Sequence, residues 1–349
     1  MTSTGSVVAA ALLLAAFGCS RAPGRSGGSS SPEWTGSETV EPSRYAGPVI
    51  DMHLRAMKAD EMGPPPMGMC PGFMAEVAHD PASPWGPSFG ALFERPACTH
   101  PIWSARTDAE LRDVTLATLK RLNVRGVLSG PRERVAQWKT RAPDRIIAGH
   151  RYRLGRESHS APELRAAFSA GEFEVLAEVT SQDSGVAPDD PSVAEVWAIA
   201  EKLDIPVGLG LGLGLPGSPY LDRPKYRARL HDPHSLEEIL IAHPRLRVYL
   251  MHAAYPRVDA LKSMLYTYPQ LYVGTGALQA LVPRAEYHAL LEELTRAGFG
   301  KRIMFGSDQM IWPGLIEEGI EAVNTAPLSV EDKRRILYEN AARFLRLEP

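Results

Sequence analysis

The sequence lacks a strong charge of either sign. Its 38 Lys and Arg residues are nearly balanced by 41 Asp and Glu residues, which gives a net charge of −3 over 349 residues. Such a balance supplies no attractive field for nucleic acid, so we expect no nucleic-acid partner. The apolar share of 44% and the charged share of 23% are ordinary for a globular protein.

Nucleotide-binding motifs are also absent. The glycine-rich run Gly208–Leu215 places its glycines at every second position. This spacing differs from GxGxxG, and the run lacks the Gly-Lys-Ser/Thr ending of a P-loop. We interpret it as a strand end and a loop in which backbones approach closely.

Cysteine is scarce, with three residues and no CxxC pair. A zinc site built from cysteines is therefore disfavoured. Cys70 and Cys98 lie in the segment Gly63–Pro101, which is rich in proline and glycine. In an exported protein we expect these two to form a disulfide that restrains a long loop.

Apolar runs long enough for a membrane span are missing, because the N-terminal run Val7–Phe17 is too short to cross a bilayer as a helix. It has the length of a signal-peptide core and ends in Ala16-Phe17-Gly18-Cys19. This ending resembles the bacterial lipobox, in which the cysteine carries lipid. We predict a signal peptide over 1–19 and a lipid anchor on Cys19, which would place the protein at the cell envelope facing the periplasm or the exterior. Plain export and a cytosolic location are the alternatives.

Beyond this region the chain divides into a tether and one domain. Residues 20–47 are rich in Ser, Gly and Pro, and such a composition cannot bury a core, so we predict a flexible tether. From 48 to 349, eight β-prone runs alternate with helical patterns. The runs begin near Val49, Val124, Ile146, Val175, Val207, Val248, Leu271 and Ile303. Eight strand-helix units favour a single α/β domain, a (β/α)8 barrel of the TIM type, over an open doubly wound sheet.

Helix signals fall between these runs. Apolar spacing and start signals predict helices over 107–122, 191–203, 233–243, 313–324 and 329–345. The first strand is instead followed by a long irregular stretch, 55–106. A loop of this length at the carboxyl end of a barrel strand should lie over the mouth and contact substrate.

Acidic and imidazole side chains follow four of the apolar runs. They are Asp51 and His53, Glu178, His252, and Asp308. Because the carboxyl ends of all barrel strands open onto one face, we expect these side chains to converge on one site. Histidine and aspartate are natural ligands for a divalent ion that activates water for hydrolysis.

Several segments carry a resemblance to a known family. In chain order they are Val49–His53, Leu176–Thr180, Pro206–Gly208, Pro216–Tyr220, Tyr249–Ala253, Arg302–Met310 and Tyr338–Phe344. Together they resemble the metal-dependent amidohydrolase superfamily, in its amidohydrolase-2 branch of hydrolases and decarboxylases. The resemblance covers most of the chain from Val49. It implies a barrel that hydrolyses a small amide, ester or lactone, or decarboxylates a small carboxylic acid.

The resemblance also assigns roles to residues. His53 matches the first histidine of the family's HxH motif, and Asp308 matches the aspartate that binds metal and handles the proton of water. His252 matches a histidine that binds a second metal or polarises substrate and water. Glu178 lies where some members place a metal ligand or a substrate contact. The metal ligands would be His53, Asp308 and Glu178, the catalytic residues Asp308, His252 and Glu178, and the metal zinc or manganese.

Three positions depart from the family pattern. The second histidine of HxH is Arg55, the expected histidine of the fifth strand is Gly210, and Gly274 stands where relatives often carry an aspartate. A guanidinium offers only hydrogen-bond donors, so Arg55 cannot coordinate a metal. The other histidines, His231 among them, lack a partner at ligand spacing and are expected to be structural or exposed.

Two hypotheses follow from these substitutions. In the first, a divalent metal still binds and the protein is an enzyme. In the second, Arg55 forms an ion pair with Asp308 or Glu178 in place of the metal, and the protein is a metal-free, non-catalytic binding barrel at the envelope.

Overall fold

The structure is a computed structural model that describes residues 43–157, 159–212 and 214–347. The predicted signal peptide (1–19), Cys19 and most of the predicted tether (20–47) lie outside these residues. Within the described ranges, no helix is both long enough and apolar enough to cross a membrane.

Eight parallel strands form a nearly closed barrel, in the order β1-β4-β5-β6-β7-β8-β9-β10. They are β1 (Val49–Arg55), β4 (Val124–Ser129), β5 (Ile146–Arg153), β6 (Val175–Thr180), β7 (Val207–Leu209), β8 (Val248–Leu250), β9 (Leu271–Gly274) and β10 (Ile303–Met304). Backbone hydrogen bonds join the two ends of this series, since Met52 N–H donates to Phe305 O at 2.9 Å and Asp308 N–H to His53 O at 2.8 Å. The predicted (β/α)8 fold is confirmed, and each strand begins at the predicted residue.

The strands are buried on both faces, which explains why they read as continuous apolar runs. All six residues of β6 are buried. Side chains that point into the barrel form one buried cluster, which includes Ile50, Met52, Val127, Val175, Tyr249, Met251 and Met304. The Tyr249 hydroxyl donates to Met52 O at 2.7 Å, so this buried polar group is satisfied. The filled interior forms the floor beneath the strand ends.

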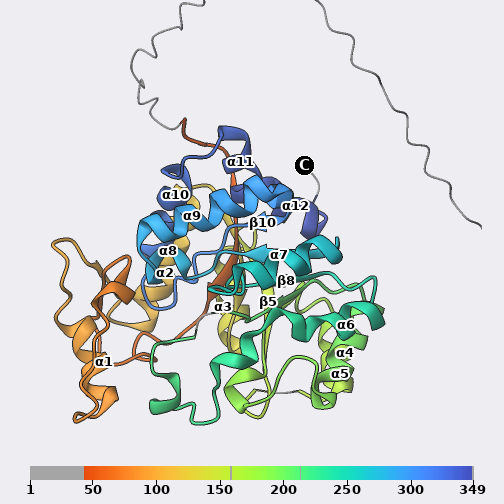
Figure 1. The fold of residues 1–349 in the computed structure, drawn as a ribbon, viewed down its shortest axis with the longest axis horizontal. Helices are drawn as coiled ribbons and strands as arrows, with labels where there is room; N and C mark the ends of the chain where they lie inside the picture. Colours follow the sequence, from red (N-terminus) through yellow and green to blue (C-terminus); the bar gives the residue numbers. More distant parts are fainter. Residues whose placement is uncertain (1–42, 158, 213, 348–349) are drawn as a thin grey trace, which may run out of the picture. The chain divides into compact units, whose positions relative to one another are not determined.

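Helices surround the strands (Figure 1). They are α1 (Trp85–Glu94), α2 (Asp108–Arg121), α3 (Arg132–Arg141), α4 (Ala161–Ser169), α5 (Ala194–Lys202), α6 (Glu237–Ala242), α7 (Val258–Thr267), α8 (Leu278–Leu281), α9 (Arg284–Leu294), α10 (Leu315–Asn324), α11 (Val330–Arg334) and α12 (Asn340–Leu345). Helix α2 begins as predicted, because Thr107 Oγ1 accepts the Glu110 N–H at 3.1 Å and caps the first turn.

Three predicted helices are less regular than their patterns suggested. Those predicted over 191–203 and 233–243 each open with a 3-10 turn, Pro191–Val193 and Pro233–Leu236. The helix predicted over 329–345 is interrupted by a π turn, Arg335–Glu339. There the Ile336 carbonyl accepts a hydrogen bond from Phe305 N–H at 2.9 Å, so a contact with the strand segment competes with regular helical bonding.

The segment 55–106 was expected to be irregular, and this expectation is wrong in part. It holds helix α1 and an antiparallel ribbon of β2 (Gly68–Met69) and β3 (Ile102–Trp103). Trp85, Phe89 and Phe93, spaced four residues apart on α1, are buried, and they pack as a small aromatic core. Cys70 and Cys98 form a disulfide, as expected. In Figure 1 this segment, in orange, extends to one side of the barrel.

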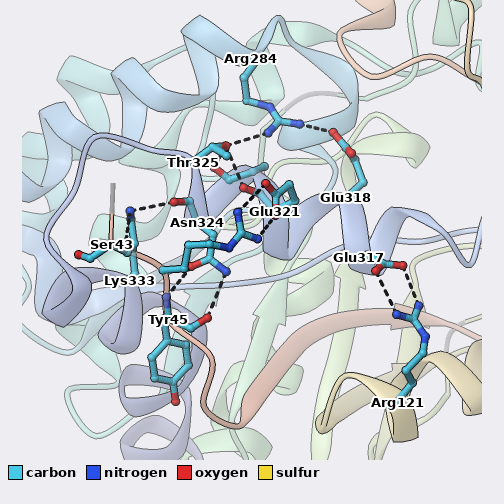
Figure 2. Close-up of polar contacts among 12 residues, drawn as sticks. Ser43, Tyr45, Arg121, Arg284, Glu317, Glu318, Glu321, Asn324, Thr325 and Lys333 are labelled. Atoms are coloured by element: carbon cyan, nitrogen blue, oxygen red, sulfur yellow. Dashed lines mark hydrogen bonds and ion pairs between the residues drawn. The ribbon is translucent and has the colours of Figure 1, made fainter. Parts of the chain in front are cut away.

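Residues just before β1 are attached to the ends of α10 and α11 (Figure 2). The buried Lys333 Nζ donates to Ser43 O at 3.1 Å and to Asn324 O at 2.8 Å. Tyr45 N–H donates to Asn324 Oδ1 at 2.9 Å, and Asn324 Nδ2 returns a bond to Tyr45 O at 3.2 Å. Arg44 adds an ion pair to Glu321. The chain therefore reaches β1 along a fixed path.

Candidate active site at the barrel mouth

The carboxyl ends of four strands bring together the residues singled out in the sequence. His53 and Arg55 lie on β1, Glu178 on β6, His252 just after β8 and Asp308 just after β10. With the exception of His53, which lies beneath them, these residues line one cavity of about 510 Å³. The expected convergence is therefore present, while the chemical role of each residue stays a prediction.

Two imidazoles and one carboxylate form the centre of the site. Ligand atoms of His53, His252 and Asp308 all lie within 4.8 Å of one another, and all three residues are buried. His53 Nε2 lies 3.5 Å from Asp308 Oδ1, and the two imidazole rings are 5.2 Å apart between centroids. A single divalent ion could contact all three groups.

The tautomer of His252 is set by the backbone. Its Nδ1 lies 2.9 Å from Gly276 O, and because a carbonyl only accepts, Nδ1 must carry the hydrogen in this contact. The neutral ring then has its lone pair on Nε2. This arrangement is typical of histidines that bind a metal.

His53 is also held in the form that binds metals. Burial lowers its pKa to about 3, so the ring is neutral at physiological pH. Neither ring nitrogen has a hydrogen-bond partner within the described part of the chain. A Cβ at Gly276 would lie 2.4 Å from His53 Nδ1, so only glycine leaves room for this ring.

Asp51, noted in the sequence without a role, positions His53. Its Oδ1 accepts the backbone N–H groups of His53 and Ser307, each at 2.9 Å. The carboxyl thus joins β1 to the segment that carries Asp308. Burial raises the pKa of Asp51 to about 7, against the opposing effect of these hydrogen bonds.

Arg55 joins the two carboxylates of the site. Its Nη1 lies 2.6 Å from Glu178 Oε2, and its Nε is ion-paired with Asp308 Oδ1. Both ion pairs that the second hypothesis considered are therefore present. The arginine backbone is fixed by Gln309, whose side chain bonds to Arg55 N at 3.0 Å and to Arg55 O at 2.7 Å.

This charge pairing controls ionisation. Burial alone would raise the pKa values of Asp308 and Glu178, but the attraction of Arg55 and of the other basic side chains around them together outweighs burial and lowers both. Burial likewise opposes the charge of Arg55, yet the two carboxylates raise its pKa. All three groups are charged at neutral pH.

The side chains of the site fit a divalent metal between His53, His252 and Asp308, but not at Glu178. Two imidazoles and an ionised carboxylate suit zinc or manganese. Glu178, the third predicted ligand, is engaged by Arg55, and no group of three or more metal-binding side chains in the described residues includes it. A Cβ at Gly210 would lie 2.9 Å from Glu178 Oε1, so a side chain there would displace Glu178.

Other cavity residues were missed in the sequence. Arg153, the last residue of β5, and Thr180, the last of β6, line the cavity, as does His231, which was expected to be structural or exposed. Arg153 and Thr180 are strand-end residues, so the rule that found His53 and Glu178 could have found them. Neither residue is an acid or an imidazole, the side chains that mark a metal site.

Comparison with known proteins agrees with this geometry. The family model described as Amidohydrolase matches residues 50–347. No curated protein matches the chain. The fold is similar to 2,6-dihydroxybenzoate decarboxylase from Rhizobium, with 18% identity, a TM-score of 0.54, and coverage of 86% of this chain and 99% of that one.

Two further solved structures share the fold. One is 5-carboxyvanillate decarboxylase from Novosphingobium aromaticivorans complexed with manganese, with 12% identity, a TM-score of 0.54, and coverage of 86% and 96%. The other is a candidate 2-pyrone-4,6-dicarboxylic acid hydrolase from Pseudomonas putida, with 13% identity, a TM-score of 0.53, and coverage of 86% and 98%. At these identities the likeness shows the fold, and the family match shows the kinship: the chain belongs to the amidohydrolase family.

Proposed function

We propose that the protein is a metal-dependent hydrolase of a small amide, ester or lactone, or a related decarboxylase. The observation that carries this proposal is the grouping of His53, His252 and Asp308 within 4.8 Å of one another beside a cavity of about 510 Å³. A cavity of this size accommodates a small-molecule substrate.

His53, His252 and Asp308 would hold the ion, zinc or manganese, which would supply Lewis acidity and lower the pKa of water. Asp308 is ionised, so its carboxylate can take a proton from an attacking water. Arg55 holds Asp308 in place and lowers its basicity. Glu178, paired with Arg55 at the cavity wall, is placed to contact substrate.

The similar structures support this reaction class. Two of them are decarboxylases, one in complex with manganese, and one is a candidate hydrolase. All share the barrel, although fold alone does not select among these reactions.

Metal content and turnover test the proposal together. The purified protein, incubated with zinc or manganese and desalted, should retain about one ion per chain and hydrolyse members of a panel of small esters and lactones, or decarboxylate small aromatic acids. Asp308→Asn should lower turnover by at least 100-fold. Retained metal without turnover on any panel member, or turnover that survives Asp308→Asn, would contradict it.

The second candidate is the metal-free binding barrel. The observation that favours it is the double ion pair of Arg55 with Asp308 and Glu178, which provides a cation to both carboxylates without a metal. Under this alternative no ion is retained after desalting, and Arg55→His combined with Gly210→His raises metal affinity. Retention of one ion by the unaltered protein excludes it.

We also propose export and lipid anchoring through Cys19. The disulfide between Cys70 and Cys98 supports an oxidising compartment. The location outside the cytosol would expose the cavity to substrates of the envelope or the exterior.

A further inference from the structure

Four guanidinium groups line the cavity, and three of them are neutralised by carboxylates that line it too. The pairs are Arg55 with Asp308 and Glu178, Arg156 with Asp222, and Arg223 with Asp183. Arg153 is different. Among the described residues, its side chain has neither an ion pair within 4.0 Å nor a hydrogen bond. A partly buried cation without a partner is unfavourable unless a ligand supplies the missing charge.

Thr180 stands beside Arg153. The two residues are register partners in the parallel pair β5 and β6, so their side chains project to the same side of the sheet. Thr180 Oγ1 is buried and finds no hydrogen-bond partner elsewhere in the described structure. The strand ends therefore present a free guanidinium and a free hydroxyl next to each other.

Gly210 allows Thr180 and Glu178 to keep their positions. A Cβ at this position would lie 3.1 Å from Thr180 Cγ2 and 2.9 Å from Glu178 Oε1, so any larger residue would push these side chains aside. The departure from the family pattern at Gly210 thus leaves the Thr180 side chain in place beside Arg153.

A third donor lies on the neighbouring wall. His231 Nδ1 accepts the Gly212 N–H at 3.2 Å, so in the neutral ring Nε2 must carry the hydrogen. Burial lowers the pKa of His231 to about 4, which keeps the ring neutral. Nε2 is buried and is unpartnered by any described residue. Arg153, Thr180 and His231 therefore each present a group that can donate a hydrogen bond to an oxyanion.

Another part of the cavity wall is apolar. It includes Met57, Phe89, Leu215, Leu281 and Met310. A ligand that satisfies both kinds of wall combines an apolar body with a charged end. Inorganic anions lack the first feature and neutral esters lack the second.

We propose that Arg153 and Thr180 form a subsite for the carboxylate of a small organic acid. The guanidinium fork matches a carboxylate in two parallel hydrogen bonds, and the Thr180 hydroxyl adds a third donor. This inference rests on the proposed function, because it names the substrate class of that site: molecules with an apolar body and a carboxylate held apart from the metal-binding trio.

Binding to metal-free protein tests the subsite directly. The EDTA-treated full chain is titrated with benzoate, with its neutral isostere benzamide and with inorganic phosphate, by calorimetry. Benzoate should bind at least tenfold more tightly than either probe. Arg153→Gln should weaken benzoate binding at least tenfold and remove the preference over benzamide. Arg156→Gln, a matched control whose guanidinium is already paired with Asp222, should change it less than twofold.

Two milder variants keep the test decisive if Arg153→Gln does not fold. Thr180→Val, which conserves shape, should weaken benzoate binding several-fold and leave benzamide unchanged. Gly210→Ala should weaken it by pushing Thr180 out of place. Any one of three results would overturn the subsite. Benzoate could bind no more tightly than benzamide, or phosphate could bind as tightly as benzoate. The third is that Arg156→Gln weakens benzoate binding as much as Arg153→Gln does.

Turnover separates this inference from the proposed function. Monomethyl glutarate, which carries a free carboxylate, should have a lower KM than dimethyl glutarate, and Arg153→Gln should raise the KM of the first alone. Hydrolysis of both esters with equal KM would contradict the proposed subsite but not the proposed hydrolase function. If benzoate binding depends on Arg153 but no substrate is turned over, the proposed hydrolase function is contradicted and the proposed subsite is not.

Discussion

The side chain of Arg55 sets the charge at the base of the cavity. With Arg55 in place, Asp308 and Glu178 are each paired and ionised. Without it, two buried carboxylates would share one low-dielectric region, where like charges repel. Arg55 therefore has a structural consequence that is independent of any reaction.

Arg55→Met should destabilise the metal-free protein by about 3–5 kcal/mol, because it leaves two buried carboxylates unpaired. Urea unfolding in EDTA measures the loss. Manganese should restore part of the stability if His53, His252 and Asp308 bind it. Arg156→Met removes a more exposed pair with Asp222 and should cost less than about 1 kcal/mol. Equal losses in both variants would contradict the assignment.

His150 provides a pH dependence that is separate from the site. It is buried on β5 against Phe168 and Phe173, and burial lowers its pKa to about 4, with His159 and Arg132 also opposing its charge. Between pH 6.5 and 4 the unfolded chain binds the proton more readily than the folded one. The folded state therefore loses stability as pH falls through this window, by roughly 3 kcal/mol from this group.

His150→Leu should flatten that part of the stability profile. Urea unfolding at pH 7, 6, 5 and 4 would show a smaller decrease in unfolding free energy than in the unaltered protein. His100→Gln, at an exposed histidine, should leave the profile unchanged. If the unfolding free energy of His150→Leu falls with pH as steeply as that of the unaltered protein, protonation of His150 does not reduce the stability of the folded state.

Among single residues, the sequence allowed us to predict the contacts that follow from charge alone. The ion pairs of Arg55 followed from the need of two acids for a cation. The roles of Arg153 and His231 did not follow, because they depend on which neighbours leave a donor unpaired. That information is tertiary: the sequence near Arg153 does not show that Arg156 and Arg223 have acidic partners, nor that Arg153 has no ion pair among the described residues.

At the scale of elements, α1 shows how a segment with unfavourable composition folds. The segment 55–106 is rich in proline and glycine, yet the aromatic residues of α1 pack together, and Phe93 contacts Trp312 with ring centroids 5.5 Å apart. The Trp85 indole donates to Pro216 O at 2.9 Å, which ties the helix to the loop after β7. Since Phe89 lines the cavity, the stability of this segment shapes the site.

Replacement of Cys70 and Cys98 by serine should loosen this segment. The disulfide closes a loop with a sequence separation of 28, so its loss should cost roughly 3–4 kcal/mol. Urea unfolding measures the loss, and limited proteolysis should cut the variant between 70 and 98 first. The unaltered protein without reductant is the control. Unchanged stability together with unchanged cleavage would mean that α1 holds its place without the bond.

The strands were predictable and α1 was not, for a physical reason. Buried parallel strands must be apolar throughout, so runs such as Val175–Thr180 mark them in the sequence. Helix α1 contains Gly86, Pro87 and Gly90, which lower local helix propensity, and its buried aromatic residues pack against one another. The π turn at Arg335–Glu339 was also missed, because its cause is a hydrogen bond from a distant strand segment.

At the scale of the whole molecule, the location of the protein can be tested in a bacterial host. If Cys19 carries lipid, the protein should incorporate radiolabelled palmitate and sediment with membranes, since a lipid anchor together with export retains it there. Cys19→Ser should abolish both the label and the sedimentation. Cys98→Ser controls for the loss of a cysteine elsewhere. Identical fractionation of the two variants would exclude the anchor.

The attachment of Ser43 and Tyr45 to the ends of α10 and α11 determines on which side of the barrel the chain enters, relative to the cavity opening. This contact lies at the amino ends of the strands, since the chain runs from it directly into β1, whereas the cavity opens at the carboxyl ends. The junction at which the described chain enters the barrel, at Ser43, is thus on the side opposite the opening. A diffusing solute can approach the opening without crossing that junction, and a fusion partner added before Ser43 would leave the approach clear.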